Sequence, residues 1–231
     1  MRRFLLFALL LTAAAHLAAD PQPRVVRILF VGNSLTYSND LPQMVAGIGA
    51  AAGVEIVTEM VAFPNFALED HLNDGRVVAA LQRQKWDFVV LQQGPSALDE
   101  SRVNLIRNTR RFADVIRKHS AEPVVMMVWP SRARSGDFEE IAASARLAAK
   151  AVHGKVIPAG QSWREAWRRS PSLELYANDG FHPSRIGTYL AALTTYRTLV
   201  GPLPRLSPSD ELRDPDLQVL LHAAAVAQPH E

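Results

Sequence analysis

The chain has 231 residues, of which 48% are hydrophobic and 21% charged, and its formal net charge is +2. This length fits one sizeable domain with at most a small appendage, and the composition excludes disordered, collagen-like and coiled-coil chains. The sequence contains no cysteine, which excludes a disulfide scaffold, a thiolate metal site, a cysteine nucleophile and a lipid anchor on cysteine.

Residues 1–19 have the layout of a secretory signal peptide. Arg2 and Arg3 precede an almost uninterrupted apolar run over residues 4–15, and small residues then offer a cleavage site before Asp20. The run is shorter than the roughly 20 residues that a membrane-spanning helix needs. An uncleaved anchor or an N-terminal helix is the alternative interpretation. We therefore expect a secreted or periplasmic protein that has no stable membrane anchor after cleavage.

Removal of the signal peptide would leave a neutral chain. It takes away two of the 25 basic residues and none of the 23 acidic ones, so the mature formal net charge is 0. Domains that bind nucleic acids carry an excess of lysine and arginine. We therefore expect no nucleic-acid partner.

Beyond Asp20, apolar runs rich in β-branched residues alternate with stretches of helical periodicity. The runs predict strands over residues 25–31, 55–61, 86–91, 123–129 and 155–158. Helices are predicted between them: one capped by Asn39, with Pro42 in its first turn and Gly53 after its end, and others over 68–84, 101–119, 138–152 and from Ser184 onward. Because parallel strands need such crossovers, the sequence predicts an α/β fold, a flavodoxin-like three-layer αβα sandwich with a five-stranded parallel sheet.

The predicted domain covers residues 20–201. Residues 202–216 are rich in proline and charge, and a short helix of leucine and alanine follows. We interpret residues 202–231 as a C-terminal extension on the surface of the domain.

The residues that suggest chemistry lie in predicted loops. In parallel sheets, ligands bind beyond the carboxyl ends of the strands, where the strand order reverses. Gly32 permits a tight turn directly after the first strand, and this turn would expose the hydroxyl of Ser34. Asp179 can orient one nitrogen of His182 and leave the other for Ser34. These residues predict a nucleophile, a base and an orienting carboxylate, although a serine in such a turn is also a common helix cap.

These residues resemble the SGNH (GDSL-type) hydrolases. Residues 28–35 (ILFVGNSL) match the first block of that family, in which the nucleophilic serine lies in a G-[DN]-S-L motif, and Asn33 stands where aspartate is frequent. Asp179 and His182 match the last block, D-x-x-H. The resemblance covers roughly residues 24–200, and it implies the SGNH-type fold and ester hydrolysis through a Ser-His-Asp triad without a cofactor.

The middle blocks, which supply the oxyanion hole of the family beside the Ser34 N–H, depart from the family pattern. Asn65 is the best match to the usual glycine, and asparagine enters left-handed conformations readily. The usual asparagine is replaced by Gln92 and Gln93, whose amides offer the same donor one methylene further out. Neighbouring strand residues face opposite sides, so both stay candidates, with a slight preference for Gln92 because it directly extends the strand. The alternative is that these glutamines only satisfy backbone groups.

Five aromatic residues fall on or near the same loops. Aromatic rings stack on sugars and pack against acyl groups, so these residues are candidates for substrate binding. Core or lid packing is an equally good interpretation of each one alone. They are Tyr37, Phe63, Phe66, Trp129 and Phe181.

The other histidines and the arginine pairs predict no second site. His71 belongs to no HExxH motif or comparable cluster, and we interpret it as a helix-surface or helix-packing residue. His119 and His153 are predicted at helix C-termini, where a cation is favourable, and His222 and His230 lie in the tail. Arg132, Arg134, Arg168 and Arg169 are interpreted as solvated surface. Without a metal-binding motif or a Gly-rich phosphate loop, we expect neither a metal nor another cofactor.

The combined interpretation is a secreted serine esterase that hydrolyses small acyl esters, with acetyl esters and a carbohydrate or other small-molecule substrate preferred. Its base must be neutral, so activity should rise through about pH 6–7, where histidines ordinarily lose their proton. Two alternatives remain. One is a catalytically degraded relative that binds glycans, and the other is an O-acyltransferase that uses the same serine.

Overall fold

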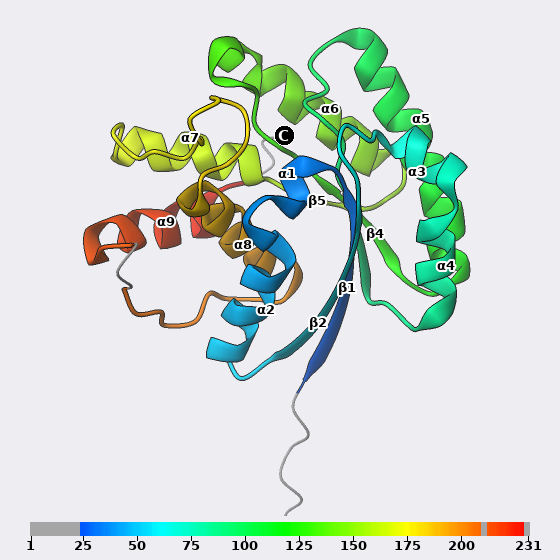
Figure 1. The fold of residues 1–231 in the computed structure, drawn as a ribbon, viewed down its shortest axis with the longest axis horizontal. Helices are drawn as coiled ribbons and strands as arrows, with labels where there is room; N and C mark the ends of the chain where they lie inside the picture. Colours follow the sequence, from blue (N-terminus) through cyan, green and yellow to red (C-terminus); the bar gives the residue numbers. More distant parts are fainter. Residues whose placement is uncertain (1–23, 209–211, 229–231) are drawn as a thin grey trace, which may run out of the picture.

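One parallel sheet organises the computed structural model, which describes residues 24–208 and 212–228. Across these residues the sheet has five strands in the order β2-β1-β3-β4-β5 (Figure 1), and each strand is parallel to its neighbours. The strands are β1 (Val25–Gly32), β2 (Glu55–Ala62), β3 (Phe88–Leu91), β4 (Glu122–Met126) and β5 (Lys155–Ile157). The predicted fold class is confirmed. The predicted signal peptide and His230 lie outside the described residues.

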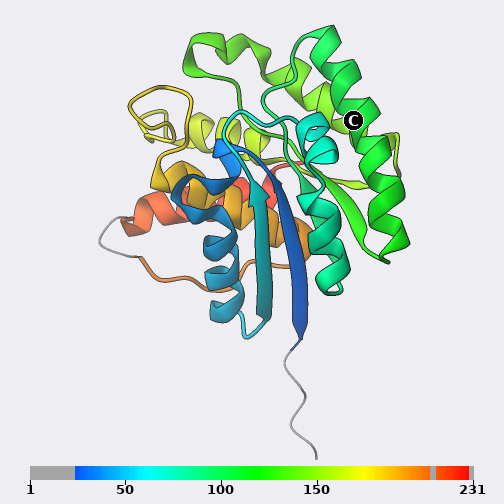
Figure 2. The ribbon, with the colours of Figure 1, turned by 45° about the vertical axis from the view of Figure 1, so that its right-hand side comes forward.

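Helices cover both faces of the sheet (Figures 1 and 2). One face is covered by α2 (Leu41–Ala51) and α8 (Arg185–Leu199), against which α7 (Ala159–Arg169) and α9 (Asp214–Val226) pack. The other face is covered by α3 (Leu68–Asp74), α4 (Arg76–Arg83), α5 (Asp99–Lys118) and α6 (Phe138–Lys150). Two short elements follow strands: α1 (Ser34–Tyr37) comes after β1, and the 3-10 turn η2 (Arg132–Asp137) comes after β4.

The central strand β1 is apolar on both faces because helices cover both. Ile28, Leu29, Phe30 and Val31 are fully buried, as expected of a strand inside a parallel sheet. Burial of both faces fixes the end of β1, and with it the start of the loop that carries Ser34.

The second predicted helix, over residues 68–84, is in fact two helices. Gly75 adopts a left-handed conformation with φ of 80° and separates α3 from α4. A left-handed glycine is a frequent helix terminator. The break lets the short helix α3 take its own direction beside the end of β1.

The predicted cap of the first long helix is also wrong by one residue. The cap of α2 is Asp40, whose carboxylate accepts the N–H of Gln43 at 3.4 Å, while Pro42 lies in the first turn as predicted. Asn39 has a left-handed backbone, with φ of 55°, and its side chain points to a different loop, described below.

The C-terminal helix α9 packs on the domain. It buries Leu217, Leu220 and Ala223 completely, and these residues belong to the same apolar core as the sheet. Residues on both sides of the predicted domain boundary at residue 201 therefore belong to one continuous apolar core. Among the described helices, none has both the length and the apolar character to cross a membrane.

Candidate active site

The candidate site lies where the strand order reverses. After β1 the chain crosses to β2 on one side, and β3 then pairs with the other side of β1. The carboxyl ends of β1 and β3 diverge into loops at this point, which is where parallel sheets bind ligands. The loop after β1 carries Ser34, and the loop after β3 begins at Gln92.

Three side chains predicted to form a triad are connected by hydrogen bonds. Ser34 Oγ lies 2.9 Å from His182 Nε2, although the two residues are 148 positions apart. His182 Nδ1 lies 2.5 Å from Asp179 Oδ2. The structure thus places a hydroxyl, an imidazole and a carboxylate in the order that activates a serine nucleophile.

Asp179 determines which nitrogen of His182 carries the proton. Its second oxygen, Oδ1, accepts the backbone N–H groups of Phe181 and His182, both at 2.9 Å. The hydrogen bond from His182, helped by the Phe181 N–H, lowers the pKa of Asp179 to about 2. The carboxylate is therefore charged and can only accept. The proton of His182 is held on Nδ1, and the lone pair on Nε2 faces the Ser34 hydroxyl.

The loop that carries His182 is held by three partners from two other segments, the stretch after β4 and the segment after Ser34. Arg132 donates its backbone N–H to Gly180 O at 2.7 Å. The indole N–H of Trp129 donates to Phe181 O at 3.1 Å. The side-chain amide of Asn39, in the segment after Ser34, donates to Pro183 O at 3.0 Å. This last bond ties the two halves of the triad together, whereas the sequence pattern predicts Asn39 only as a helix cap.

The structure does not support Trp129 as a substrate-binding residue. Its side chain is fully buried and stacks on Trp163 with ring centroids 3.8 Å apart. The chain continues beyond β4 directly into the core, so the ring has no open surface. Trp129 instead supports the His182 loop through its indole N–H.

The turn that presents Ser34 is built around the buried side chain of Gln92. Its Oε1 accepts the N–H of Asn33 and the hydroxyl of Thr36, both at 2.8 Å. A Cβ on Gly32 would lie 2.4 Å from this oxygen and 2.3 Å from Thr36 Oγ1. Only glycine fits there, which explains the G-N-S-L pattern by close packing.

Gln92 therefore does not occupy the position of an oxyanion donor, which the sequence favours for it. Its side chain is fully buried, and its Nε2 is buried without a partner among the described residues. A donor for an oxyanion must be reachable by substrate. Gln92 supports the Ser34 turn, and Gln93 remains the candidate donor after β3.

Solved structures resemble this arrangement over nearly their whole length. A protein from Slackia heliotrinireducens described as an SGNH hydrolase is 29% identical, and the match covers 76% of this chain and 100% of that one with a TM-score of 0.64. A DUF4886 family protein from Bacteroides uniformis is 19% identical, with 87% and 93% covered and a TM-score of 0.76. An acetylxylan esterase from Geobacillus stearothermophilus is 13% identical, with 80% and 99% covered and a TM-score of 0.60. The last two likenesses, at such low identity, show the fold alone.

No protein-family model and no curated protein sequence matches the chain. The likeness to the Slackia heliotrinireducens protein extends over the full length of that protein, at 29% identity. The chain is similar to this SGNH hydrolase in both fold and sequence. Its G-N-S-L turn and D-x-x-H loop meet at the hydrogen bond between Ser34 and His182.

The loop after β2 faces the Ser34 turn. Asn65 is exposed and has φ of 61°, the left-handed conformation predicted for a residue that replaces glycine. Asn33 Nδ2 donates to Phe66 O at 3.0 Å, which joins the two loops. Among the described residues, the backbone N–H groups of Ser34 and Asn65 have no acceptor. Both are therefore free to bind an oxyanion.

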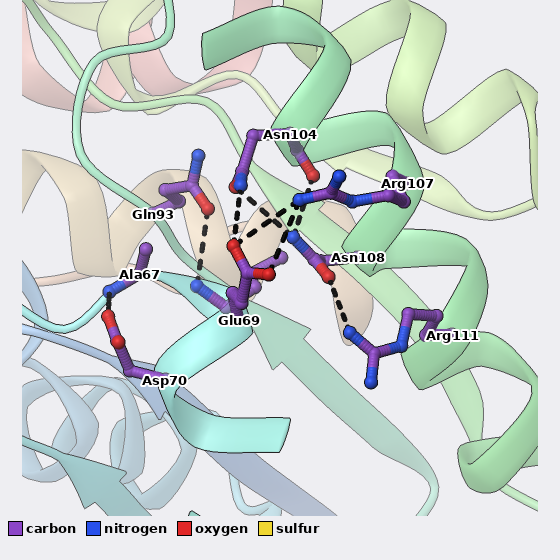
Figure 3. Close-up of polar contacts among 9 residues, drawn as sticks. Ala67, Glu69, Asp70, Gln93, Asn104, Arg107, Asn108 and Arg111 are labelled. Atoms are coloured by element: carbon purple, nitrogen blue, oxygen red, sulfur yellow. Dashed lines mark hydrogen bonds and ion pairs between the residues drawn. The ribbon is translucent and has the colours of Figure 1, made fainter. Parts of the chain in front are cut away.

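Gln93 anchors the far end of the same loop (Figure 3). Its Oε1 accepts the N–H of Leu68 at 3.2 Å, and this backbone donor fixes which end of the amide is oxygen. The nitrogen, Nε2, is left with a long 3.3 Å contact to Ser96 Oγ. The partly exposed amide can therefore offer an N–H to substrate.

Further hydrogen bonds hold helix α3 near the Gln93–Leu68 hydrogen bond (Figure 3). Asp70 Oδ2 accepts the N–H of Ala67 at 2.8 Å, and Glu69 accepts the side-chain amide of Asn104 on α5 at 2.9 Å. Arg107 pairs with the same carboxylate at 3.3 Å. The loop that holds Asn65 thus ends on a helix that is hydrogen-bonded to α5.

We expect the variant Gln93→Glu to show whether Gln93 is an oxyanion donor or only satisfies backbone groups. Glutamate still accepts the Leu68 N–H but replaces the free amide donor by a negative oxygen. If Gln93 binds the oxyanion, kcat should fall by at least about 10²–10³-fold, the usual cost of one lost donor. If Gln93 only satisfies the backbone, kcat of Gln93→Glu should stay near that of the exposed control Gln84→Glu. Steady-state kinetics on an acetyl ester measures this.

The other predicted aromatic residues are half-buried around these loops. Phe63 and Phe66 lie with ring centroids 5.1 Å apart, and Arg76 covers the Phe63 ring at 3.6 Å. Phe181 lies against the His182 ring at 5.2 Å. Tyr37, at the end of α1, is also half-buried. Phe66, Phe181 and Tyr37 are partly exposed, as is Phe63, which contacts both Arg76 and Phe66.

The remaining histidines and arginines lie as follows. His119 caps the end of α5, His153 follows α6, and His222 lies 3.6 Å from Glu165. Arg168 and Arg169 pair with the same glutamate on the surface, and Arg134 pairs with Asp137. Arg132 is exposed, as predicted, and pairs with Glu174 at 3.3 Å. Within residues 24–208 and 212–228, no three His, Asp or Glu side chains are placed to hold a metal.

Proposed function

We propose that this chain is a secreted serine esterase that removes small acyl groups, above all acetyl, from carbohydrate esters. The observation that carries the proposal is the hydrogen-bonded chain Ser34–His182–Asp179 at the end of β1, with distances of 2.9 and 2.5 Å. The proposed export rests on residues 1–19 of the sequence, which have the layout of a signal peptide.

The geometry supports acyl transfer in two steps. Ser34 Oγ attacks the ester carbonyl while its proton passes to His182 Nε2, and the carbonyl oxygen becomes an oxyanion. The intermediate then breaks its bond to the alcohol oxygen, which takes the proton from His182, and the acyl group stays on Ser34. Water attacks this acyl-enzyme while its proton passes to His182, and the acid leaves as Ser34 Oγ takes that proton back from His182. Asp179 stays charged and stabilises the imidazolium.

The oxyanion would be held by the N–H groups of Ser34 and Asn65 and by the Nε2 of Gln93. Each lost donor of this type typically costs about 2.7–4 kcal/mol of transition-state stabilisation. All three come from segments that the bonds around Gly32, Asn33 and Leu68 hold in place. Such fixed donors need no reorganisation as charge develops on the substrate.

The surroundings of the triad favour a polar alcohol over a lipid. The side chains of His182 and Asp179 are 37% and 50% exposed, so the site is open. A cavity of about 580 Å³ borders Asp179 and is lined by polar groups that include Arg132, Glu174 and Asn178. His182 returns its proton to the alcohol, so the alcohol part of the ester lies on the side of the site that borders this cavity. The acetylxylan esterase of Geobacillus stearothermophilus, which shares the fold, acts on a substrate of this kind.

An ester panel tests the proposal. We expect mature wild-type protein to hydrolyse 4-nitrophenyl acetate faster than the butanoyl and octanoyl esters, and to release acetate from acetylated xylooligosaccharides. Hydrolysis that increases with acyl length, or no turnover by well-folded protein, would contradict it. The second result would favour glycan binding without hydrolysis, an alternative suggested by the missing glycine and asparagine of the middle blocks.

The same triad could pass the acyl group to a sugar instead of water. Product analysis separates the two reactions: a hydrolase gives free acetate whether or not an unacetylated oligosaccharide is added. Appearance of a newly acetylated sugar at the expense of acetate would assign the chain to the transferases.

The pH profile is a further expected result. Activity should rise with pH with the slope of a single proton, because a histidine acts as a general base only in its neutral form. Asp179 adds no second proton to this slope, because its pKa of about 2 keeps it charged throughout. Initial rates between pH 4.5 and 9 measure the profile. A rate that stays flat down to pH 5 would exclude a histidine base.

A further inference from the structure

His71, on α3, is a buried histidine outside the triad that contacts the nucleophile turn. Its side chain is only 1% exposed, and its Nε2 lies 2.8 Å from the carbonyl oxygen of Gly32. A carbonyl oxygen can only accept, so the proton of His71 is on Nε2 and the imidazole is the donor. The carbonyl belongs to the Gly32–Asn33 peptide, directly before Ser34.

The rest of the imidazole is surrounded by apolar groups. The rings of Phe66 and Phe63 lie at 5.1 and 6.0 Å from it, and its Nδ1 is buried with no partner among the described residues. Burial lowers the pKa of His71 and outweighs the opposing effect of the hydrogen bond to Gly32, so the ring is neutral. A buried nitrogen without a partner reduces stability, and a phenyl ring would fill the same space without that cost.

The bond from His71 holds a peptide on which several parts of the site depend. The Gly32 oxygen also accepts the N–H of Phe63, at 3.2 Å, which begins the loop that holds Asn65. The other side of the same peptide, the Asn33 N–H, donates to Gln92 at 2.8 Å. Rotation of this peptide would therefore move Ser34 relative to the Asn65 N–H.

We propose that His71 is a positioning residue for ester hydrolysis, which fixes the Gly32–Asn33 peptide and thereby aligns Ser34 with the oxyanion donors. The proposal rests on the proposed esterase function. His71 is buried under the loops and acts through them without touching substrate. It explains why a histidine with an unsatisfied nitrogen occupies a position that an apolar residue would fill more stably.

The expected effect is on the transition state. The alignment of Ser34 with the oxyanion donors matters when the oxyanion forms, and less when the ester first binds. Loss of the donor should thus lower kcat with little change in KM. Because small misplacements of reacting groups cost up to about 10²-fold, we expect a reduction of about 10- to 100-fold.

Substitutions of His71 and a matched control test the inference. His71→Phe removes the donor and fills the space, and it should lower kcat about 10- to 100-fold, with KM within about twofold and a Tm no lower than that of wild type. His71→Gln restores an N–H at a similar distance from the backbone, and it should recover most of kcat. His119→Phe, at the opposite end of the sheet, is the matched control and should leave kcat unchanged. His71→Met, which also lacks the donor, replaces His71→Phe if that variant does not fold.

The inference is overturned by wild-type kcat in a folded His71→Phe protein. It is equally overturned if His71→Gln loses as much activity as His71→Phe at the same Tm, since the donor would then be irrelevant. The rate at which a fluorophosphonate labels Ser34 reports the same alignment without an ester substrate. A normal labelling rate in His71→Phe refutes the inference, whereas an unreactive wild type refutes the proposed function itself.

Discussion

Ser34→Ala should lower kcat/KM for acetyl esters by about 10⁴- to 10⁶-fold, the range found when a triad loses its nucleophile. The hydroxyl 2.9 Å from His182 Nε2 is the atom that would form the acyl-enzyme, and alanine leaves nothing in its place. Because the triad acts as a unit, the double variant Ser34→Ala/His182→Ala should be no slower than either single one. Kinetics of all three variants and their Tm values measure this.

The matched control for this prediction is Ser172→Ala, an exposed serine in the loop after α7. It should retain full activity. If Ser34→Ala kept more than about a tenth of wild-type activity, Ser34 would not be the nucleophile. Additive losses in the double variant would also show that Ser34 and His182 do not work together.

Asp179→Asn should be the second largest effect, with a loss of about 10³- to 10⁴-fold in kcat. Asparagine can keep the oxygen that accepts the N–H groups of Phe181 and His182, so the loop should stay in place. Its NH₂ group, however, would face Nδ1 of His182. The imidazole then holds its proton on Nε2, the wrong tautomer to accept a proton from Ser34. Kinetics at pH 8 and the tautomer seen by ¹⁵N NMR measure the effect.

Stability should change much less than activity in this variant. A carboxylate with a lowered pKa stabilises the fold above its ordinary pKa, near pH 4, and this contribution is lost as the pH falls toward 2. Asp179 is 50% exposed, so solvent screens the contribution. Asp114→Asn, on the exposed surface of α5, is the control. A loss of activity that follows the loss of Tm would mean that Asp179 only supports the fold.

The sequence predicts the parts of this molecule that depend on local patterns. Strand β1 reads as a continuous apolar run because both its faces are buried, and the loops at its end follow from the sheet topology. Ser34, His182 and Asp179 could be identified because chemically distinctive residues lie in two such loops. Their contact, across 148 positions, follows once the sheet places those loops at the same edge.

The predictions that failed depend on tertiary contacts. Whether Gln92 or Gln93 faces substrate depends on which side of β3 is covered. Gln92 occupies the buried position. Trp129 lies in the core because the chain beyond β4 continues inward. Asn39 ties Pro183 to the Ser34 segment, and His71 reaches Gly32 from a separate helix. No spacing in the sequence indicates these partners, because they are set by how α3 and α8 pack on the sheet.

The most direct test of the central claim is labelling of the mature protein with a fluorophosphonate. The claim is that His182 and Asp179 make the hydroxyl of Ser34 nucleophilic. Intact mass should show one phosphonyl group per chain, peptide mapping should locate it on Ser34, and Ser34→Ala should remain unlabelled. A folded wild-type protein that takes up no label, or takes it up at another residue, would contradict the account.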